Sequence, residues 1–232
     1  MNRLFKLIII LTITFSSFSI ADAQKHNSFA GFRYGWALPM GEMASHEFGS
    51  GGYALLGKSI EAEAAWFITP KIGFGIDVSS NTFGFATGFY AEDYLETKPE
   101  YSNVEMLSGP YKLTTLMGGL YYKVSLTEKL STRLKLMGGL FTARTPDQFY
   151  GVEAFMVGKL YFWKTSSLDR KFTFLTGAAF EYKLYDHVYI LLQADYTYAK
   201  AAFKYNAGRE SEYTDYMNMP VFRLQPGINI SF

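Results

Sequence analysis

The chain lacks cysteine altogether, has only three histidines among 232 residues, and contains no long apolar run after residue 23. The missing cysteines exclude a disulfide framework and a lipid-anchored N-terminus. The missing apolar runs exclude a membrane-spanning helix in this part of the chain, because such a helix needs about 20 apolar residues. The charges nearly cancel, with 22 Lys and Arg against 21 Asp and Glu, so no nucleic-acid partner or acidic substrate is expected.

The first 23 residues have the pattern of a cleavable secretory signal peptide. Arg3 and Lys6 give a positive start, Leu7 to Ile13 form an apolar run, and Ala21-Asp22-Ala23 is a small-residue cleavage site. The apolar run is too short for a membrane anchor helix. Cleavage leaves Gln24 as the first residue, and no linker or change of composition divides the remaining chain. We therefore predict a signal peptide at 1–23 and one folded domain at 24–232.

After the signal peptide, apolar and polar residues alternate with a period of two, which is typical of β-strands with unlike faces. Eight segments show this alternation, and each is long enough for a tilted strand to cross a bilayer. They are Ser28–Leu38, Lys58–Phe67, Lys71–Phe83, Tyr111–Ser125, Ser131–Ala143, Phe172–Lys183, Val188–Ala199 and Val221–Phe232. The connections alternate between short turns, such as Leu126–Lys129, and long ones, such as Gly84–Pro110. The sequence thus predicts an all-β fold: a transmembrane, antiparallel, up-and-down β-barrel of eight strands, with short periplasmic turns and long extracellular loops.

The two faces of these strands differ in charge. One face is free of charge and carries Ile60, Ala62, Ala64, Trp66, Ile72, Phe74, Ile76, Val78, Leu116, Leu120, Tyr122, Val124, Leu134, Leu136, Leu140, Phe172, Phe174, Ala178, Phe180, Tyr182, Val188, Ile190, Leu192, Tyr196, Tyr198, Phe222, Leu224, Ile228, Ile230 and Phe232. The other face carries Arg33, Glu61, Glu63, Asp77, Lys123, Arg133, Lys135, Glu181, Lys183, Asp195 and Arg223.

Alternation alone does not say which face points outward, because a soluble, lipocalin-like barrel shows the same pattern with its faces reversed. The export signal, the sorted connections and aromatic residues near strand ends favour a lipid-facing apolar side. Those aromatic residues are Trp36, Trp66, Tyr122, Tyr182, Tyr196 and Tyr198. The eleven charges then line the lumen, where their sign alternates from hairpin to hairpin. Pairing between neighbouring hairpins would plug a lumen this narrow.

Three groups of residues carry a resemblance to a known family: Pro39-Met40-Gly41-Glu42 with Gly49–Tyr53, the glycine pairs Gly118-Gly119 and Gly138-Gly139, and the terminal strand. With these features the chain resembles the small outer-membrane barrels of the OmpX and OmpA-transmembrane-domain type, in particular the Bacteroidetes outer-membrane β-barrel variety. The resemblance implies that Phe222, Ile228, Ile230 and Phe232 form a C-terminal signal for the barrel-assembly machinery.

Two further stretches leave alternatives open. Phe149 to Trp163 is apolar enough for a strand, which favours a hairpin above the membrane, with a ten-stranded barrel as the alternative. Leu116-Met117-Gly118-Gly119-Leu120 recurs as Leu136-Met137-Gly138-Gly139-Leu140 on the next strand. Glycine in strands usually marks bends or close packing, so this repeat predicts no ligand motif.

No constellation for catalysis, metal binding or a cofactor stands out. His26 and His187 lie in a tail and a short turn, and His46 lies beside Ser45, Glu47 and Ser50 without the spacing of lipid-modifying enzymes. The acidic second long connection lacks the regular ligand spacing of a calcium loop.

We therefore expect a non-enzymatic protein of the cell outer membrane, acting as an envelope scaffold or as an adhesion protein that binds through its loops. The alternatives are a narrow porin or transporter of small hydrophobic molecules, and a secretion or assembly component. The expected partners are outer-membrane lipid, lipopolysaccharide, the barrel-assembly machinery, and a surface protein or host ligand. Loop aromatic residues suited to such contacts are Phe48, Phe89, Tyr90, Tyr94, Tyr150, Tyr213 and Tyr216.

Overall fold

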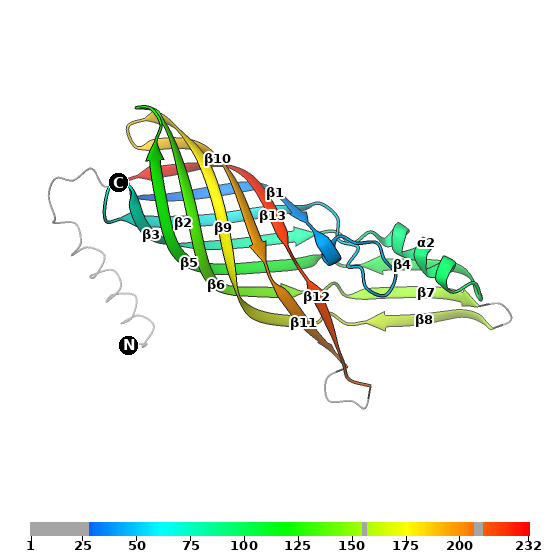
Figure 1. The fold of residues 1–232 in the computed structure, drawn as a ribbon. Coiled ribbons are helices and arrows are strands. Elements are labelled where there is room, and N and C mark those ends of the chain that lie inside the picture. The colour runs from blue at the N-terminus through cyan, green and yellow to red at the C-terminus, as the bar shows by residue number, and fades with distance from the viewer. Residues whose placement is uncertain (1–27, 155–156, 207–210) are drawn as a thin grey trace, which may run out of the picture.

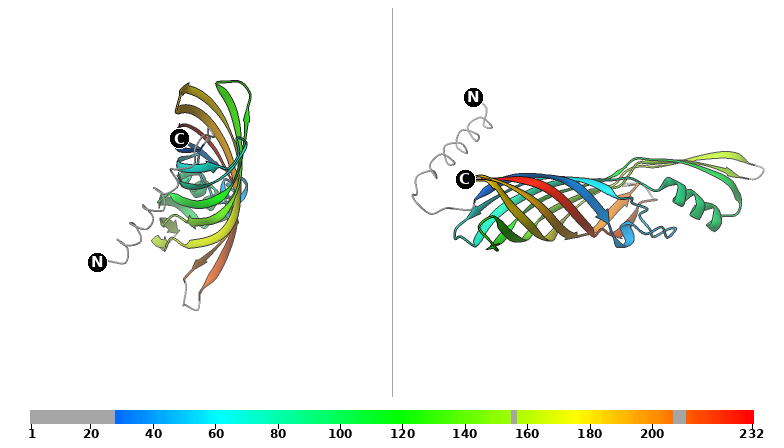
Figure 2. Two further views of the ribbon diagram at one scale, coloured as in Figure 1. Left: turned by 90° about the vertical axis from the view of Figure 1, so that its left-hand side faces the viewer. Right: turned by 90° about the horizontal axis from the view of Figure 1, so that it is seen from above.

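The computed structural model describes residues 28–154, 157–206 and 211–232. Their main body is a closed antiparallel barrel of eight strands, as the sequence predicts (Figures 1 and 2). The strands are β1 (Phe29–Pro39), β2 (Gly57–Phe67), β3 (Ile72–Phe83), β5 (Tyr111–Ser125), β6 (Leu130–Arg144), β9 (Leu168–Tyr185), β10 (Val188–Tyr198) and β13 (Val221–Ser231). They follow one another around the barrel in chain order, and β1 pairs with β13 to close it. The predicted signal peptide, residues 1–23, lies outside the described residues.

The predicted strands agree with the observed ones to within one residue at nearly every end. The exception is β9, which was expected to span Phe172 to Lys183 and is longer at both ends. Its pairing with β6 continues until Leu168 lies opposite Arg144, the last residue of β6.

Three short turns join β2 to β3, β5 to β6 and β9 to β10 at one end of the barrel, which we call the turn end (Figure 1). Threonine hydroxyls close two of these turns. Thr69 Oγ1 accepts a hydrogen bond from the backbone N–H of Ile72 (2.9 Å), and Thr127 Oγ1 accepts one from Leu130 (3.0 Å). The C-terminus lies at the same end.

The four long connections lie at the opposite end, which we call the loop end, and they contain further elements. These are η1 (Gly41–Met43), α2 (Thr87–Thr97), β4 (Tyr101–Ser108), β7 (Gln148–Ala154), β8 (Gly158–Lys164), β11 (Lys200–Tyr205) and β12 (Tyr213–Asn218). The expected hairpin within Phe149–Trp163 is confirmed as β7 and β8. The ten-stranded alternative is wrong, because β7 pairs with β4 and β8 in a separate three-stranded sheet that extends beyond the barrel (Figure 1).

The uncharged face of the strands points outward and the charged face inward. On β6 and β9, for example, Leu136 is 61% and Phe174 66% exposed, whereas the neighbouring Met137 and Leu175 are each 1% exposed. The lipocalin-like alternative with reversed faces is therefore wrong. Among the described residues, no helix is both long and apolar enough to cross a membrane.

Two apolar clusters fill the two ends of the barrel interior. The cluster at the turn end includes Phe29, Phe67 and Tyr121. The cluster at the loop end includes Phe83 and Phe141 from the barrel, together with residues of the long connections. The middle of the lumen, between these clusters, is left for polar side chains.

The repeated Leu-Met-Gly-Gly-Leu segments lie on the adjacent strands β5 and β6. Met117 pairs with Gly139, and Met137 pairs with Gly119. A Cβ atom on either glycine would lie 2.2 Å from a backbone carbonyl oxygen of the opposing strand. The repeat is thus a close-packing device, in which each methionine lies beside a glycine that has no room for a side chain.

Candidate functional site: the charged barrel interior

The structure places ten of the eleven predicted lumen charges inside the barrel, each at most 8% exposed. Five are acids and five are bases, so their formal charges cancel. The acids are Glu61, Glu63, Asp77, Glu181 and Asp195, and the bases are Arg33, Lys123, Arg133, Lys135 and Arg223.

The assignment of Lys183 to this network is wrong. Its side chain is 32% exposed, and its Nζ lies 3.1 Å from Oδ1 of Asp186 in the turn after β9. The physical reason is the position of Lys183 near the end of β9, where the strand has reached the rim of the barrel and water can solvate the ammonium group.

Lys135 on β6 lies at the centre of the network, in contact with four carboxylates. Its Nζ lies 2.9 Å from Asp77 Oδ2, 3.1 Å from Glu61 Oε1, 3.1 Å from Asp195 Oδ2 and 3.6 Å from Glu63 Oε2. These carboxylates belong to β2, β3 and β10, and none of these strands is a neighbour of β6. One buried ammonium group therefore joins strands across the lumen.

Two arginines connect the same carboxylates to the closing strands β1 and β13. Arg223 on β13 lies 3.1 Å from Glu61 Oε2 and 2.9 Å from Asp195 Oδ2. Arg33 on β1 lies 2.7 Å from Glu63 Oε2. The pairs thus include the strands that meet where the barrel closes. Paired and hydrogen-bonded charges avoid the large desolvation cost of an isolated ion in such an interior.

A second group of charges lies toward the turn end. Arg133 on β6 forms an ion pair with Glu181 on β9, and Lys123 Nζ on β5 lies 3.6 Å from Glu181 Oε2. Arg133 also lies 3.7 Å from Glu63, which links this group to the central one. The Arg133 guanidinium sits 3.9 Å from the ring centroid of Phe29, so the network continues into the apolar cluster as a cation–π contact.

Uncharged polar residues complete the network, and sequence reasoning did not select them. Gln193 donates hydrogen bonds to Glu61 Oε1 (2.6 Å) and Asp195 Oδ2 (2.8 Å). Asn229 donates to Glu181 Oε1 (2.7 Å) and accepts one from Arg33 (3.0 Å). Their position in the sequence could have identified them as lumen residues, because each occupies an inward position of its strand in the same alternation as the charges.

Glycines make room for this network. Gly177 on β9 faces inward opposite Asp195, and a Cβ there would lie 1.9 Å from Asp195 Oδ1 and 2.9 Å from Lys135 Cε. A Cβ on Gly31 of β1 would lie 1.8 Å from Asn229 Oδ1. These two positions therefore require the absence of a side chain for the ion pairs to form as observed.

The network has the donor set of a metal site but holds a cation of its own. Oxygens of Glu61, Glu63 and Asp77 lie within 4.8 Å of one another, and the Lys135 ammonium contacts all three carboxylates. This ammonium group compensates the three carboxylates as a metal ion would.

His46 lies away from this interior, in the long connections, where it stacks against the rings of Tyr53 (5.4 Å) and Phe89 (4.6 Å).

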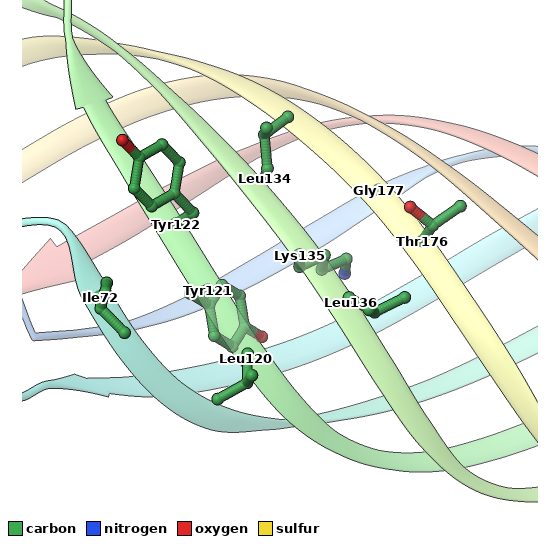
Figure 3. A pocket seen from close by; sticks show the side chains of 9 residues that line it. All are labelled: Ile72, Leu120, Tyr121, Tyr122, Leu134, Lys135, Leu136, Thr176 and Gly177. Atoms are coloured by element: carbon green, nitrogen blue, oxygen red, sulfur yellow. The ribbon is translucent and has the colours of Figure 1, made fainter.

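The outer wall over Lys135 is apolar and slightly hollowed. A shallow depression of about 430 Å³ lies over β3, β5, β6 and β9 (Figure 3). Leu120, Leu134 and Leu136 line its outer side, whereas Tyr121 and Lys135 lie on the inner side of the same strands. One layer of sheet therefore separates an apolar outer face from an ionic inner face.

The six aromatic residues predicted near strand ends all point outward and form two groups. Trp66, Tyr122 and Tyr182 lie toward the turn end, and Trp36, Tyr196 and Tyr198 lie toward the loop end. Such pairs of aromatic belts flank the lipid-facing band of membrane barrels.

The sequence predicts seven aromatic residues of the long connections as contact residues, but the structure exposes only some of them. Tyr94 of α2 is buried, and Phe48, Tyr90 and Tyr150 pack around it in a third apolar cluster. Phe89, Tyr213 and Tyr216 are exposed, as expected for contact residues. Four of the seven thus build the loop end rather than present a surface.

A closed eight-stranded barrel with an apolar exterior, two aromatic belts and a polar interior has the architecture of transmembrane β-barrels. No protein-family model matches the chain, and no curated protein sequence matches it.

Solved structures of small barrels are similar in fold. Neisserial surface protein A is 14% identical, over 91% of this chain and 100% of its own, with a TM-score of 0.45. Ail, the attachment invasion locus protein of Yersinia pestis, is 12% identical over 90% of this chain and 100% of its own, also at 0.45. The outer membrane protein AlkL is 12% identical over 91% and 93%, at 0.49. At these identities the likeness concerns the fold alone.

Proposed function

We propose that the protein is a non-enzymatic β-barrel of the bacterial outer membrane, with its loop end outside the cell. The apolar exterior and its aromatic belts support this placement. No other part of the described chain covers this apolar surface, and lipid would remove it from water. In such barrels the short turns face the periplasm. Export would depend on the signal peptide predicted at 1–23.

We infer that the lumen is closed, and the observation that carries this inference is the position of Lys135. Its four carboxylate partners lie on strands across the barrel, so the ion pairs occupy the middle of the lumen. An eight-stranded barrel is only just wide enough for its side chains to fill. The barrel then serves as a scaffold, and the function belongs to the loop end.

The loop end offers an exposed apolar surface for a binding partner, either a surface protein or a host ligand. On the sheet of β4, β7 and β8, Leu107, Phe149 and Trp163 are neighbours in register and are 73%, 40% and 71% exposed. Tyr161 on β8 adds a further exposed ring. Exposed aromatic residues on a rigid sheet suit an adhesion or partner-binding role.

The lipid partners in this proposal are outer-membrane phospholipid and lipopolysaccharide around the barrel wall. The barrel-assembly machinery is the proposed partner during biogenesis. Phe222, Ile228, Ile230 and Phe232 all lie outward on or beside β13, where an assembly factor could contact them before the barrel closes.

Separate experiments test the placement and the closed lumen. Membrane-extracted protein should migrate faster on a detergent gel before boiling than after it, and protease added to intact cells should cut only the long connections. Recovery in the soluble periplasmic fraction contradicts the membrane placement.

Purified protein in planar lipid bilayers should give no steady current. Steady channels of large conductance contradict the closed lumen and favour the porin alternative. Since this measurement does not depend on cellular location, the two parts of the proposal fail independently.

A further inference from the structure

All four long connections meet at a small cavity above the loop-end apolar cluster. Its volume is about 120 Å³. Its walls include Phe48, Tyr90, Gln148, Lys164, Tyr205 and Asp215. Residues from all four connections therefore converge on one space of the size of a small molecule.

Hydrogen bonds between the connections hold this cavity in shape. Tyr111 donates to the carbonyl of Gly52 (2.9 Å), and Tyr205 donates to Thr145 Oγ1 (3.2 Å). Ser167 donates to the carbonyl of Lys204 (2.7 Å). The walls are thus fixed before any ligand arrives, which lowers the entropic cost of binding.

The cavity contains one cation and one anion that do not pair with each other. Lys164 Nζ lies 4.4 Å from the ring centroid of Tyr205, and burial lowers the pKa of Lys164, while the charge of Asp215 opposes that shift. Within the part of the chain that the structure describes, no ion pair joins Lys164 to a carboxylate or Asp215 to a base. Two opposite charges therefore face one small, partly dehydrated space.

Aromatic rings form the apolar part of the walls. The rings of Phe48 and Tyr90 lie 5.8 Å apart, and Tyr205 stacks on Tyr213 at 5.2 Å. A ligand in this cavity would place its apolar part against rings and its polar part between a lysine and an aspartate. Small-molecule sites commonly combine apolar walls with a few convergent polar groups in this way.

We propose that the cavity binds a free amino acid, with the ligand carboxylate at Lys164, its ammonium group at Asp215 and its side chain against the aromatic wall. A zwitterion satisfies both charges at once, whereas a neutral sugar or a simple anion leaves at least one of them without a charged partner. This site deepens the proposed function of the loop end and rests on it, since the ligand must reach the loops from outside the cell.

The test is calorimetric titration of the full chain, folded in micelles of a polyoxyethylene detergent, with L-valine as the probe. N-acetylvaline lacks the cation and valinamide lacks the anion, so each should bind at least ten-fold more weakly than valine. Lys164→Met and Asp215→Asn should each weaken valine binding to a similar extent. Lys159→Met is the matched control, because Lys159 lies on the same strand but pairs with Glu105 outside the cavity (3.5 Å).

Heat-modifiable migration on a detergent gel establishes that each variant is folded before titration. The proposal is overturned if folded protein shows no binding of valine at millimolar concentration, if the three probes bind equally, or if methyl glucoside binds more tightly than valine. Because the titration uses purified protein, a negative result leaves the membrane placement and the closed lumen untouched.

Discussion

Gly177 on β9 and Asp195 on β10 lie directly opposite each other, and a methyl group on Gly177 would lie 1.9 Å from Asp195 Oδ1. Asp195 is one of the four carboxylates around Lys135, so the absence of a side chain at Gly177 is a condition for the central ion pairs. The carboxylate could avoid an added methyl group only by moving away from Lys135 or Arg223.

We expect Gly177→Ala to destabilise the barrel by about 1–3 kcal/mol, the usual cost of overpacking a filled interior. Urea unfolding in detergent or lipid, followed by tryptophan fluorescence, measures the change. Gly118→Ala is the control, because its Cβ would point outward and lie at an ordinary 3.7 Å from the carbonyl oxygen of Gly75. Equal effects of the two substitutions would show that the ion pairs place no special demand on position 177.

Replacement of Lys135 by methionine should cost about 3–5 kcal/mol in the free energy of unfolding, because it leaves four carboxylates without their shared cation. Asp77→Asn in the same chain should recover part of the loss, since it removes one of the uncompensated charges. Lys129→Met, in an exposed turn, serves as the control. A Lys135→Met protein as stable as the unmodified one contradicts the central role of this ammonium group.

The contact between Glu42 and Asn218 should weaken in acid. Asn218 donates two hydrogen bonds of 2.6 Å to the Glu42 carboxylate, one from its backbone and one from its side chain, and they lower the pKa of Glu42 below its ordinary 4.5. Ionised Glu42 therefore stabilises the contact above pH 4.5, and this contribution is lost as the pH falls through the lowered pKa.

Hydrogen exchange of the backbone amide of Asn218, followed as the pH is lowered stepwise from neutral until the Glu42 carboxylate is protonated and corrected for the intrinsic rate, measures this loss. In Glu42→Gln the protection should be weaker at neutral pH and should no longer change with acidification. Protection that stays constant in the unmodified protein contradicts the assignment.

Phe232→Ser should reduce the amount of assembled barrel in cells by more than its small effect on the stability of refolded protein, which comes from the lost ring contact with Trp66 (6.2 Å). The ring of Phe232 is 60% exposed, and its backbone N–H still donates to Ser28 after the change (3.0 Å). Quantitative blotting of unboiled outer membranes gives the assembled fraction. Tyr185→Ser, which removes another exposed aromatic ring at the turn end (74%), is the control. An identical reduction in both variants argues against a C-terminal signal.

The barrel strands could be predicted from sequence because two opposite environments act on alternate residues. Lipid on one side excludes charged residues, and a filled lumen on the other limits the size of side chains. The alternation of exposed and buried residues in β6 from Leu134 to Leu140 is therefore nearly free of exceptions. Helix α2 lacked such a signal. Ala86 at its N-cap makes no capping hydrogen bond, Gly88 lies in its first turn, and its Tyr94 is held by packing against other elements.

The members of the charge network could be predicted, whereas their pairing could not. Lys135 and Glu61 are separated by 74 residues and by two intervening strands, β3 and β5. Whether they meet depends on the curvature of the closed wall and on the reach of both side chains across it. The misplacement of Lys183 has the same origin, because strand alternation gives the direction of a side chain and not its depth in the barrel.

The position of Lys135 also bears on the order of assembly. Glu61, Glu63 and Asp77 belong to the second and third barrel strands, and the lysine that neutralises them arrives only with the fifth. Among the inward side chains of the first three strands, only Arg33 is a base, so an open sheet that entered the bilayer early would carry three acids into hydrocarbon with one counter-ion, at a cost that closure lowers. We therefore expect insertion and closure of this barrel to be coupled, and a sheet that stalls before β6 joins it to stay at the membrane surface.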